Sequence, residues 1–454
     1  MRFPSLPSLP ALLLASLALA SLLVPAGPLP AAAADDGRLL KVVALSRHGV
    51  RAPTQKHKTL EEWSERVWPV WPVKRGELTP RGGELVTAMW GTVRENFRKE
   101  GILPANLCQR PADVFVRADT DERTRATARA LLDALAPDCR LGYAVSSDAI
   151  DPLFHPVKAG LYAFDPIGAA TDILSMTNGG LGQLQDDLAT PLALIGRLSS
   201  PVSPRLCGKF NLPPDCALSD IPNAVSVSPD GRDVGITGSL AIASSLAEIF
   251  LLEYGEWPGV AAGWGQVRAD TLRQVLPVHA RVFDVVNRAP LVAWARGSSL
   301  LSEMGAALLG IHYDERCNKA ALVVFVGHDT NIANLGALLG VQWQLPEYPP
   351  NGIPPASLLM LELWEKNGQR EVRVNFLAQP MAALHAPIAA QGLLSPSDLA
   401  SHAPATAAVS APPVVGSARF PLEEFRGRIA EATAGAPIAP PQVPPLDSAR
   451  EVLK

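Results

Sequence analysis

The chain has 454 residues, of which 48% are hydrophobic and 19% charged, and its formal net charge is −4 at pH 7. A chain of this length and composition can bury at least one large hydrophobic core, and its mildly acidic balance argues against nucleic acid as a general partner. Local concentrations of arginine are therefore interpreted as local functional sites.

The first 34 residues have the organisation of an export signal. Arg2 supplies a positive charge, residues 11–24 form an apolar stretch, and residues 31–34 are alanines that offer cleavage sites. The apolar stretch is too short for a convincing membrane span, and no later segment reaches the required length. We therefore expect a mature chain that starts near Asp35, is periplasmic or secreted, and has no membrane association after cleavage. An uncleaved anchor is the alternative.

The next element is a predicted strand that ends in a basic cluster. An apolar run over residues 42–45 is followed closely by Arg47, His48, Gly49 and Arg51. Such a cluster fits best just beyond the carboxyl end of a buried strand, where the ligands of open α/β sheets bind. Two guanidinium groups that flank an imidazole can hold a tetrahedral dianion such as phosphate. A basic surface turn is the alternative.

A second strand and helix place another arginine near this cluster. A proline preceded by Thr79 is typical of a helix start and predicts a helix over residues 80–99. A strand over residues 114–118 and a helix over residues 122–136 should follow. Arg123, at the start of that helix, is expected within reach of the first cluster, although its acidic neighbours are also typical of an ordinary helix N-terminus.

From residue 148 the sequence predicts helices separated by turns, because apolar residues recur about every 3.6 positions. We expect three long helices, over residues 237–254, 269–288 and 290–309, and no strong strand before residue 321. The predicted fold class is therefore α/β, with an α/β domain formed by residues 35–147 and 300–454 and an inserted α-helical domain over residues 148–299.

The sheet is expected to resume over residues 321–326, ending in His328 and Asp329 before a short helix over residues 332–339. The N-terminus of such a helix directs amide groups at a bound anion. A His–Asp pair is often only a structural hydrogen bond, but this one repeats the strand-end position of His48.

A hairpin over residues 358–364 and 371–376 should close the sheet. Residues 385–454 are rich in alanine and proline and are predicted to be partly a loose tail.

The five cysteines, Cys108, Cys139, Cys207, Cys216 and Cys317, form no C-x-x-C pair. The usual zinc spacings are absent, so we expect neither a metal nor a cofactor. In an oxidising compartment, Cys108 with Cys139 and Cys207 with Cys216 are plausible local disulfides. Cys317 would then be a buried free thiol, although the sequence alone does not fix the connectivity.

These residues allow phosphoryl transfer without a metal. A neutral His48 can attack phosphorus and form a phosphohistidine, while the cationic groups stabilise the phosphate oxygens. Asp329 can protonate the leaving alcohol. An ordinary aspartate is ionised at neutral pH, so either burial raises its pKa or the protein works in acid. Nearby arginines would lower that pKa, and the sequence leaves this balance open.

Three strings resemble the motifs of the histidine acid phosphatases, in particular the bacterial periplasmic branch of phytase/acid phosphatases and glucose-1-phosphatases: RHGVRAPT at 47–54, DERTR at 121–125 and GHDTNIANLGALLG at 327–340. The likeness covers roughly residues 39–380. It implies an α/β domain with an inserted α-helical domain, and hydrolysis in two steps through a phosphohistidine.

The resemblance also implies roles for individual residues. By motif position, His48 becomes the nucleophile, Asp329 the proton donor, and the phosphate ligands become Arg47, Arg51, Thr54, Arg123 and His328. Family likeness further suggests Asp119, Glu248 and His279 as pocket residues. Their alternatives are a capping acid, an exposed helix residue and a core histidine.

The expected function is an exported acid phosphatase for phosphomonoesters, with phytate as the favoured substrate (4-/6-phytase type), because DERTR and the glycine of RHGVR are more similar to the phytases. A glucose-1-phosphatase or a broad sugar-phosphate phosphatase is the alternative. A phosphotransferase similar to phosphoglycerate mutase, or a non-catalytic phosphate binder, is less favoured. The expected partner is a small phosphorylated molecule, and the expected state is a monomer.

Overall fold

The computed structural model describes residues 37–161, 163–386, 405–407, 409–410, 418–436, 439, 441, 444 and 446–447. The predicted signal, residues 1–34, lies outside the described residues, as does much of the predicted tail. No helix in the described ranges has both the length and the apolar character that a membrane crossing needs.

The strands of the described residues form one main sheet. Their order across it is β10-β9-β8-β1-β6-β2-β3-β13, and β12 pairs with β9. The central strands β1, β6, β2 and β3 are parallel to one another, whereas β8 runs antiparallel to β1. The bounds are β1 Arg38–Arg47, β2 Val114–Ala118, β3 Tyr143–Val145, β6 Leu322–Gly327, β8 Leu358–Lys366, β9 Gln369–Ala378, β10 Ala405–Ala407, β12 Ala418–Pro421 and β13 Leu446–Asp447.

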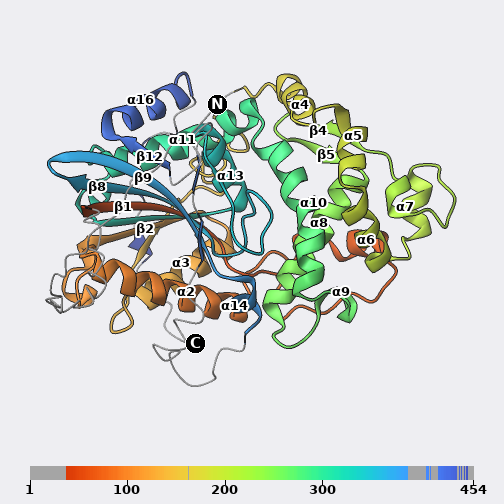
Figure 1. Cartoon of the computed structure of the whole chain (residues 1–454), viewed down its shortest axis with the longest axis horizontal. Coiled ribbons are helices and arrows are strands. Elements are labelled where there is room, and N and C mark those ends of the chain that lie inside the picture. Colours follow the sequence, from red (N-terminus) through yellow and green to blue (C-terminus); the bar gives the residue numbers. More distant parts are fainter. Residues whose placement is uncertain are drawn as a thin grey trace, which may run out of the picture. The chain divides into compact units, whose positions relative to one another are not determined.

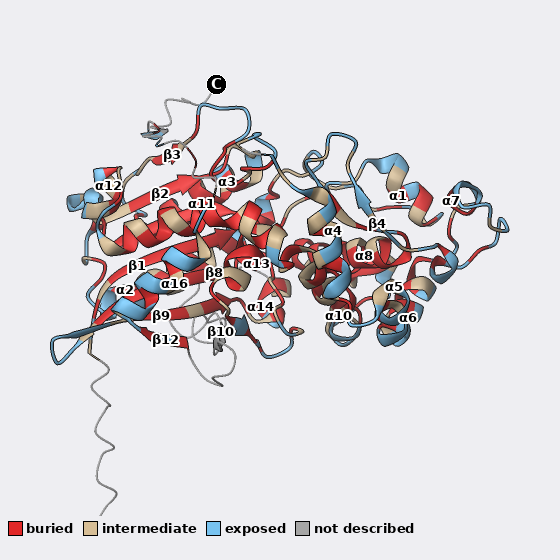
Figure 2. Cartoon of the chain, turned by 90° about the horizontal axis from the view of Figure 1, so that it is seen from above, coloured by how far each residue is buried: buried red, intermediate tan, exposed pale blue. Residues whose placement is uncertain are grey.

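Helices cover both faces of this sheet (Figure 1). Val42 and Ala44 of β1 pack with helices α2 (Pro80–Lys99) and α3 (Glu122–Leu135). The alternate residues Val43 and Leu45 belong to the core that contains α11 (Pro290–Leu309), α13 (Asp329–Leu338) and α16 (Leu422–Ala432). Because successive residues of a strand point to opposite faces, β1 is buried on both sides. Figure 2 shows the strands in the colour of buried residues between these helices.

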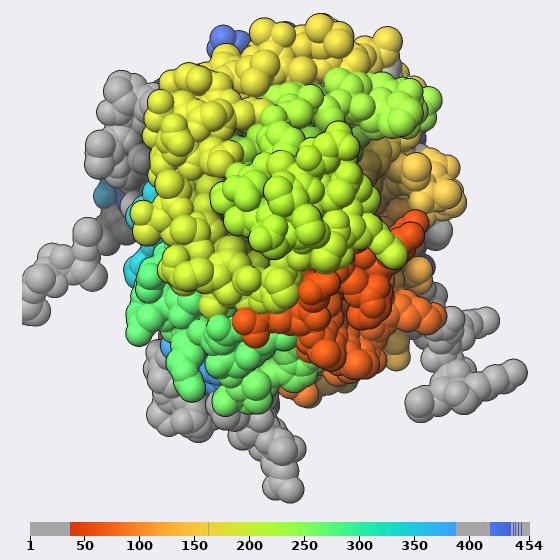
Figure 3. All heavy atoms as spheres, turned by 90° about the vertical axis from the view of Figure 1, so that its right-hand side faces the viewer, coloured from red at the N-terminus to blue at the C-terminus, as the bar shows by residue number. Residues whose placement is uncertain are grey.

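The segment between β3 and α11 is mainly helical and lies to one side of the sheet (Figure 1). Its helices are α4 Pro166–Ser175, α5 Gly180–Asp187, α6 Ala189–Ser199, α7 Pro204–Lys209, α8 Ser239–Glu256, α9 Ala262–Gly265 and α10 Ala269–Asn287. Figure 3 views this side, where its yellow and green spheres meet the orange-red spheres of the chain between β1 and α2. That this segment is a domain of its own remains a prediction.

The sequence predicted most elements of the sheet and its helices. The α/β fold class is confirmed, and α2 and β2 have the predicted bounds. A hairpin of β4 (Ala224–Val227) and β5 (Val234–Thr237) was missed, because both strands are only four residues long and β4 is mostly exposed. Helix α13 begins at Asp329, three residues before the predicted start.

Part of the predicted tail region packs onto the fold. Strand β12 leads into helix α16, whose Phe425 is fully buried. Ile429 of this helix contacts α11 where Gly305 has no side chain. The short remaining elements are α1 His57–Trp63, α12 Glu315–Lys319, α14 Met381–His385 and the pair β7 Gln342–Trp343 with β11 Val409–Ser410.

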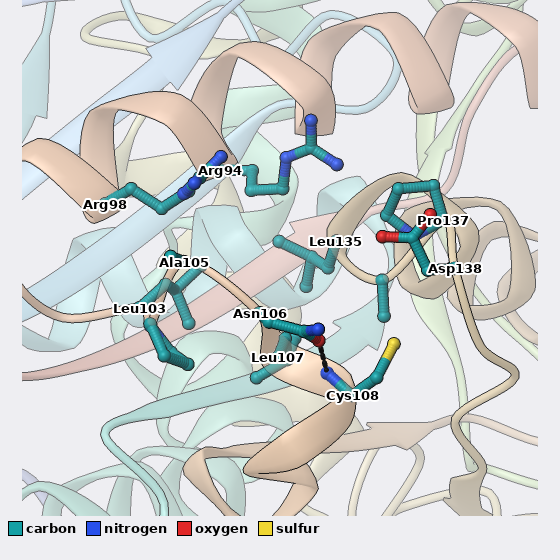
Figure 4. A pocket seen from close by; sticks show the side chains of 12 residues that line it. Arg94, Arg98, Leu103, Ala105, Asn106, Leu107, Cys108, Leu135, Pro137 and Asp138 are labelled. Carbon is teal, nitrogen blue, oxygen red and sulfur yellow. Dashed lines mark hydrogen bonds between the residues drawn. The ribbon is translucent and has the colours of Figure 1, made fainter.

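Both predicted disulfides are confirmed. Cys108–Cys139 and Cys207–Cys216 have Cα–Cα distances of 5.9 and 5.8 Å, and Cys317 is free and buried. A surface hollow lies beside Cys108, and Figure 4 shows Arg94 and Arg98 of α2 on one side of it. Glu95 contacts both arginines and therefore offsets part of their positive charge.

Helix α8 carries a buried carboxyl group, that of Glu253. No cation is among the groups that shift its pKa. Glu253 accepts a hydrogen bond from the backbone N–H of Gly263 at 2.7 Å. Burial raises the pKa of Glu253 to about 7, and the Gly263 bond opposes only part of this effect. The folded protein therefore binds a proton that the unfolded chain has already lost above its ordinary value of 4.5. The contribution of Glu253 to the free energy of unfolding therefore becomes increasingly unfavourable as the pH rises from about 4.5 towards 7.

Replacement of Glu253 by glutamine keeps an acceptor for Gly263 but removes the charge. At about pH 8 we expect Glu253→Gln to raise the free energy of unfolding by on the order of 3 kcal/mol, since one pKa unit corresponds to about 1.4 kcal/mol. At about pH 4 no gain is expected. Denaturant unfolding at both pH values measures this, with the exposed Glu431→Gln on α16 as the matched control. An equal change at both pH values would contradict it.

Candidate active site

The ends of three neighbouring strands bring the predicted site residues together. In the parallel register, Arg47 at the end of β1 pairs with Gly327 at the end of β6. His48 and His328 follow these residues, and their ring centroids lie 5.7 Å apart. Asp119 follows β2, which pairs with β6 on its other side. The expectation that these residues gather at the carboxyl edge of the sheet is thus met by the geometry.

The ring of His48 is buried and held in one tautomer. Its Nδ1 atom lies 2.9 Å from the carbonyl oxygen of Gly49, which can only accept, so Nδ1 carries the proton and Nε2 has a free lone pair. Burial, followed by the charges of Arg51 and Arg47, lowers the pKa of His48 well below its usual value. The ring therefore stays neutral, and nucleophilic, in mild acid.

The backbone after His48 is fixed by helix α2 and the turn before it. The carbonyl of Val50 accepts from the N–H of Thr79 at 3.0 Å, and the N–H of Ala52 donates to the carbonyl of Glu77 at 3.1 Å. Gly82 lets the first turn of α2 approach this loop, because a Cβ atom there would lie 2.1 Å from the carbonyl oxygen of Val50. The loop geometry thus depends on a glycine in the helix that it faces.

Arg47 joins the sheet to the helical segment. Its guanidinium is fully buried and donates hydrogen bonds to Glu248 on α8 and to the carbonyl of Ile353, and it lies 3.0 Å from Asp329. Burial alone would lower the pKa of Arg47, but the two carboxylates outweigh this and raise it. Glu248 also lies 3.5 Å from Nε2 of His279 on α10. Two helices of the segment, α8 and α10, therefore contribute to the site.

Asp329 opens α13 directly beside this guanidinium. Burial by itself would raise its pKa, but Arg47 and Arg51 outweigh that effect and lower the pKa to about 2. The balance that the sequence left open is therefore decided by the arginines: with no anion bound, Asp329 is ionised across the mildly acidic range.

Asp119 organises the second half of the cluster. It is fully buried, and its Oδ2 atom accepts from Nε2 of His328 at 2.6 Å and from Nε2 of His155 at 2.8 Å. Burial would raise its pKa, but these two hydrogen bonds outweigh it and hold the pKa far below the usual range. Arg123 lies 3.3 Å from Nδ1 of His328 and 2.6 Å from Asp121.

Each of the three predicted arginine ligands has a buried hydrogen-bond donor that finds no acceptor among the described residues. The Nε atoms of Arg47, Arg51 and Arg123 are all buried without an acceptor among the described residues. Burial lowers the pKa of Arg51 to about 10, so it remains charged. Cationic donors without acceptors, next to a neutral imidazole, suit an oxyanion such as phosphate.

Thr54 is the predicted ligand with the weakest connection to this cluster. Its side chain is exposed and lies beside Gly76, where an added Cβ would be 3.7 Å from Thr54 and 3.9 Å from Arg123. It therefore lies near Arg123, at the edge of the site.

The sequence missed two members of the network, His155 and Asp121. His155 ends a turn 36 residues after its partner Asp119, and no periodicity or spacing links the two. The only available signal was an additional histidine within residues 39–380, the span of the family likeness. Asp121 was within a recognised motif, but its contact with Arg123 depends on the fold of the helix start.

Four side chains could in principle approach a metal ion. Asp119, Asp121, His155 and His328 have ligand atoms within 4.8 Å of one another. Both imidazoles already donate to Asp119, and Asp121 is paired with the guanidinium of Arg123. Because the guanidinium of Arg123 lies within the cluster and the hydrogen bonds of both imidazoles are satisfied, we interpret the cluster as a polar network and assign no metal to it.

Comparisons of sequence and structure show the family of this chain. The family model of the histidine phosphatase superfamily (branch 2) matches residues 38–183 and 260–376, more than half of the chain. The chain belongs to this family. The family expectation from the three motifs is therefore confirmed.

Relatives within this superfamily include phosphatases of two kinds. Phytase AppA of Escherichia coli (strain K12) is 36% identical over 358 residues, which cover 76% of this chain and 82% of AppA. A glucose-1-phosphatase of Salmonella typhimurium is 27% identical over 303 residues, covering 66% of this chain and 70% of that protein. The Hafnia alvei phytase in complex with tartrate superposes with a TM-score of 0.78 and 33% identity, covering 89% of this chain and 99% of that one.

The loop that holds His48 should be sensitive to the glycine that faces it. We expect Gly82→Ala to displace Val50, to lower the free energy of unfolding by about 1–3 kcal/mol and to reduce phosphatase activity by about 100-fold, because small misplacements of reacting groups are costly. Gly83→Ala is the matched control, since its added Cβ would meet only Leu78 at 4.0 Å. Thermal unfolding and hydrolysis of an aryl phosphate measure both. Equal behaviour of the two variants would contradict the account.

Proposed function

We propose that this histidine phosphatase is an exported acid phosphatase that hydrolyses phosphomonoesters through a phosphohistidine at His48. The observation that carries the proposal is the state of His48: a buried neutral ring whose Nδ1–H is held by Gly49 while Nε2 is free, among arginines with unmet donors. A ring nitrogen with a free lone pair is a good nucleophile, and the arginines stabilise the charge of the transferring phosphoryl group.

In the first step, Nε2 of His48 forms a bond to phosphorus while the bond to the leaving oxygen breaks. The roles of the phosphate ligands fall to Arg47, Arg51, Arg123 and His328, with Thr54 at the edge. Asp329 gives a proton to the leaving alcohol. In the second step the Asp329 carboxylate takes a proton from water, whose oxygen attacks phosphorus and releases phosphate from His48.

The low pKa of Asp329 requires a source for its proton. A phosphate monoester has a second pKa near 6, so below that pH the substrate arrives with a proton of its own. When the phosphate binds the arginines, they stabilise the ionised carboxylate of Asp329 less. Asp329 can then accept this proton. Since His48 stays neutral in acid, we expect activity to be highest in the acidic range and to fall as the pH rises above about 6.

Phytate is the favoured substrate. Exposed cations flank the edge of the site: Lys74 and Arg75 precede Gly76, which lies beside Thr54 and Arg123, and Lys56 follows Thr54 by two positions. Such a rim attracts a substrate with many phosphate groups. Two relatives support this choice, AppA and the Hafnia alvei phytase, which also has a structure in complex with myo-inositol hexakis sulphate. A glucose-1-phosphatase or a broad sugar-phosphate phosphatase is the second candidate, favoured by the Salmonella relative.

The place of action follows from the amino-terminal sequence and the disulfides. Removal of residues 1–34 would release a periplasmic or secreted protein, and two disulfides suit an oxidising compartment. We propose that it acts there as a monomer on small phosphorylated molecules.

The substrate assignment is tested by phosphate release from phytate, glucose 1-phosphate and an aryl phosphate between about pH 2 and pH 8, the span over which carboxylates and histidines titrate. We expect the highest kcat/KM for phytate, in acid, and none with His48→Ala. Preference for glucose 1-phosphate would favour the second candidate. Phosphate binding without release from any ester would indicate a binding protein instead.

Replacement of Asp329 by asparagine separates proton donation from phosphate binding. We expect Asp329→Asn to slow hydrolysis of alkyl phosphates by roughly a further 100-fold relative to aryl phosphates, because an aryl oxide leaves without a proton. The comparison of kcat for the two ester types measures this, and Thr330→Ala, at the next position of α13, is a control for local disturbance. Equal losses on both esters would exclude Asp329 as the acid.

A further inference from the structure

One carboxylate oxygen is shared by two histidines. The Oδ2 atom of Asp119 accepts from Nε2 of His328 at 2.6 Å and from Nε2 of His155 at 2.8 Å, and the two rings are 5.1 Å apart. Its Oδ1 atom accepts from the N–H of Thr120 at 2.7 Å, which fixes the orientation of the carboxylate. His328 belongs to the proposed phosphate site, whereas no step of the proposed reaction uses His155.

The turn that carries His155 is anchored on both sides. Asp151, at its start, is fully buried and pairs with Arg117 of β2 at 3.2 Å. The carbonyl of Phe154 accepts from the side chain of Asn331 on α13 at 3.0 Å. The N–H of His155 donates to the carbonyl of Asp151 at 2.9 Å. His155 is therefore held beside Asp119 by the same strand and helix that position Asp119 and His328.

The hydrogen bonds define the protonation of His328 in the unliganded site. Arg123 can only donate, so Nδ1 of His328, at 3.3 Å, accepts, and the Nε2–H donates to Asp119. When a phosphate draws Arg123 away, Nδ1 can take up a proton and donate to the anion. The resulting imidazolium would be stabilised by Asp119. A second N–H on the same Oδ2 atom weakens this stabilisation.

We propose that His155 is a positioning residue of the phosphate site: through the shared Oδ2 atom of Asp119, it favours the neutral form of His328, in which Nδ1 accepts from Arg123, over the protonated form that can donate to a phosphate. It thereby sets the upper pH limit of phosphate binding. This inference rests on the proposed function, because it assigns His328 to the bound phosphate.

Several charged groups face His328 and act on its proton affinity. They come from the end of β1 (His48), the end of β2 (Asp119), the start of α3 (Asp121 and Arg123), the anchored turn (His155) and its own helix (Asp329). Burial lowers the pKa of His328; the hydrogen bond that its Nε2–H donates to Asp119 opposes this, and Arg123 and His155 add to the lowering. Removal of the His155 donor takes away the lowering effect of His155 and strengthens the opposing effect of Asp119. Both changes raise the pKa of His328.

The test compares His155→Phe, which keeps a ring but has no donor, with His155→Gln, which returns an N–H at a similar reach. The titration of His328 is followed by ¹⁵N NMR without substrate and assigned with His328→Asn; the chain has eight histidines. In His155→Phe we expect the midpoint of His328 to shift to higher pH and inorganic phosphate at about pH 7 to bind on the order of tenfold more tightly, the effect of one hydrogen bond to a charged group. His155→Gln should stay close to the parent protein.

An unchanged His328 titration in His155→Phe would overturn the inference, as would a shift that His155→Gln shows equally. If the Phe variant does not fold, His155→Leu provides the same comparison. The NMR titration needs no turnover, so it separates two failures. A shifted midpoint in a protein without phosphatase activity would contradict the proposed function alone, and an unshifted midpoint in an active enzyme would contradict only the role of His155.

Discussion

The site depends on one buried cation, the guanidinium of Arg47. A charge removed from water is costly unless it is paired, and here two carboxylates from different parts of the chain supply the pairing: Glu248 from α8 and Asp329 from α13. Since the three groups come from the sheet, the helical segment and the helix after β6, the site is complete only when all three have folded against each other. The helical segment is thus required by the electrostatics of the site, in addition to any role in substrate choice.

The same pairing sets the protonation of the groups around it. Burial and the arginines keep His48 neutral, and the arginines keep Asp329 ionised, before a substrate arrives. In the proposed reaction, a phosphate that enters takes over the positive charge, and the stabilisation of the Asp329 carboxylate then weakens. The site can therefore use one set of arginines both to bind the phosphate and to release Asp329 for proton transfer, which connects binding to chemistry without a metal in the proposed steps.

The sequence was most informative where chemistry follows directly after a strand. Arg47, His48, His328 and Asp329 could be placed together because parallel strands end at a common edge, and the start of α2 could be placed from Thr79 and its proline. Contacts between side chains from distant turns could not be predicted in this way. His155 meets Asp119 only because a buried ion pair and an asparagine hold its turn against β2 and α13.

The direction of the Asp329 pKa shift was a second limit of the sequence. Burial and the arginines act in opposite directions on this carboxyl group, and the outcome depends on distances that no motif contains. Thr54 illustrates the converse: its motif placed it among the phosphate ligands, while the fold leaves its side chain exposed at the edge of the site.

The central claim is that His48 carries the phosphoryl group during turnover. Rapid quenching with a ³²P-labelled phosphoester, followed by peptide mapping, tests it most directly. The account predicts a label on His48 that is lost in acid and survives alkali, and no label in His48→Ala. Full hydrolytic activity without any labelled histidine, or a label on another residue, would contradict it.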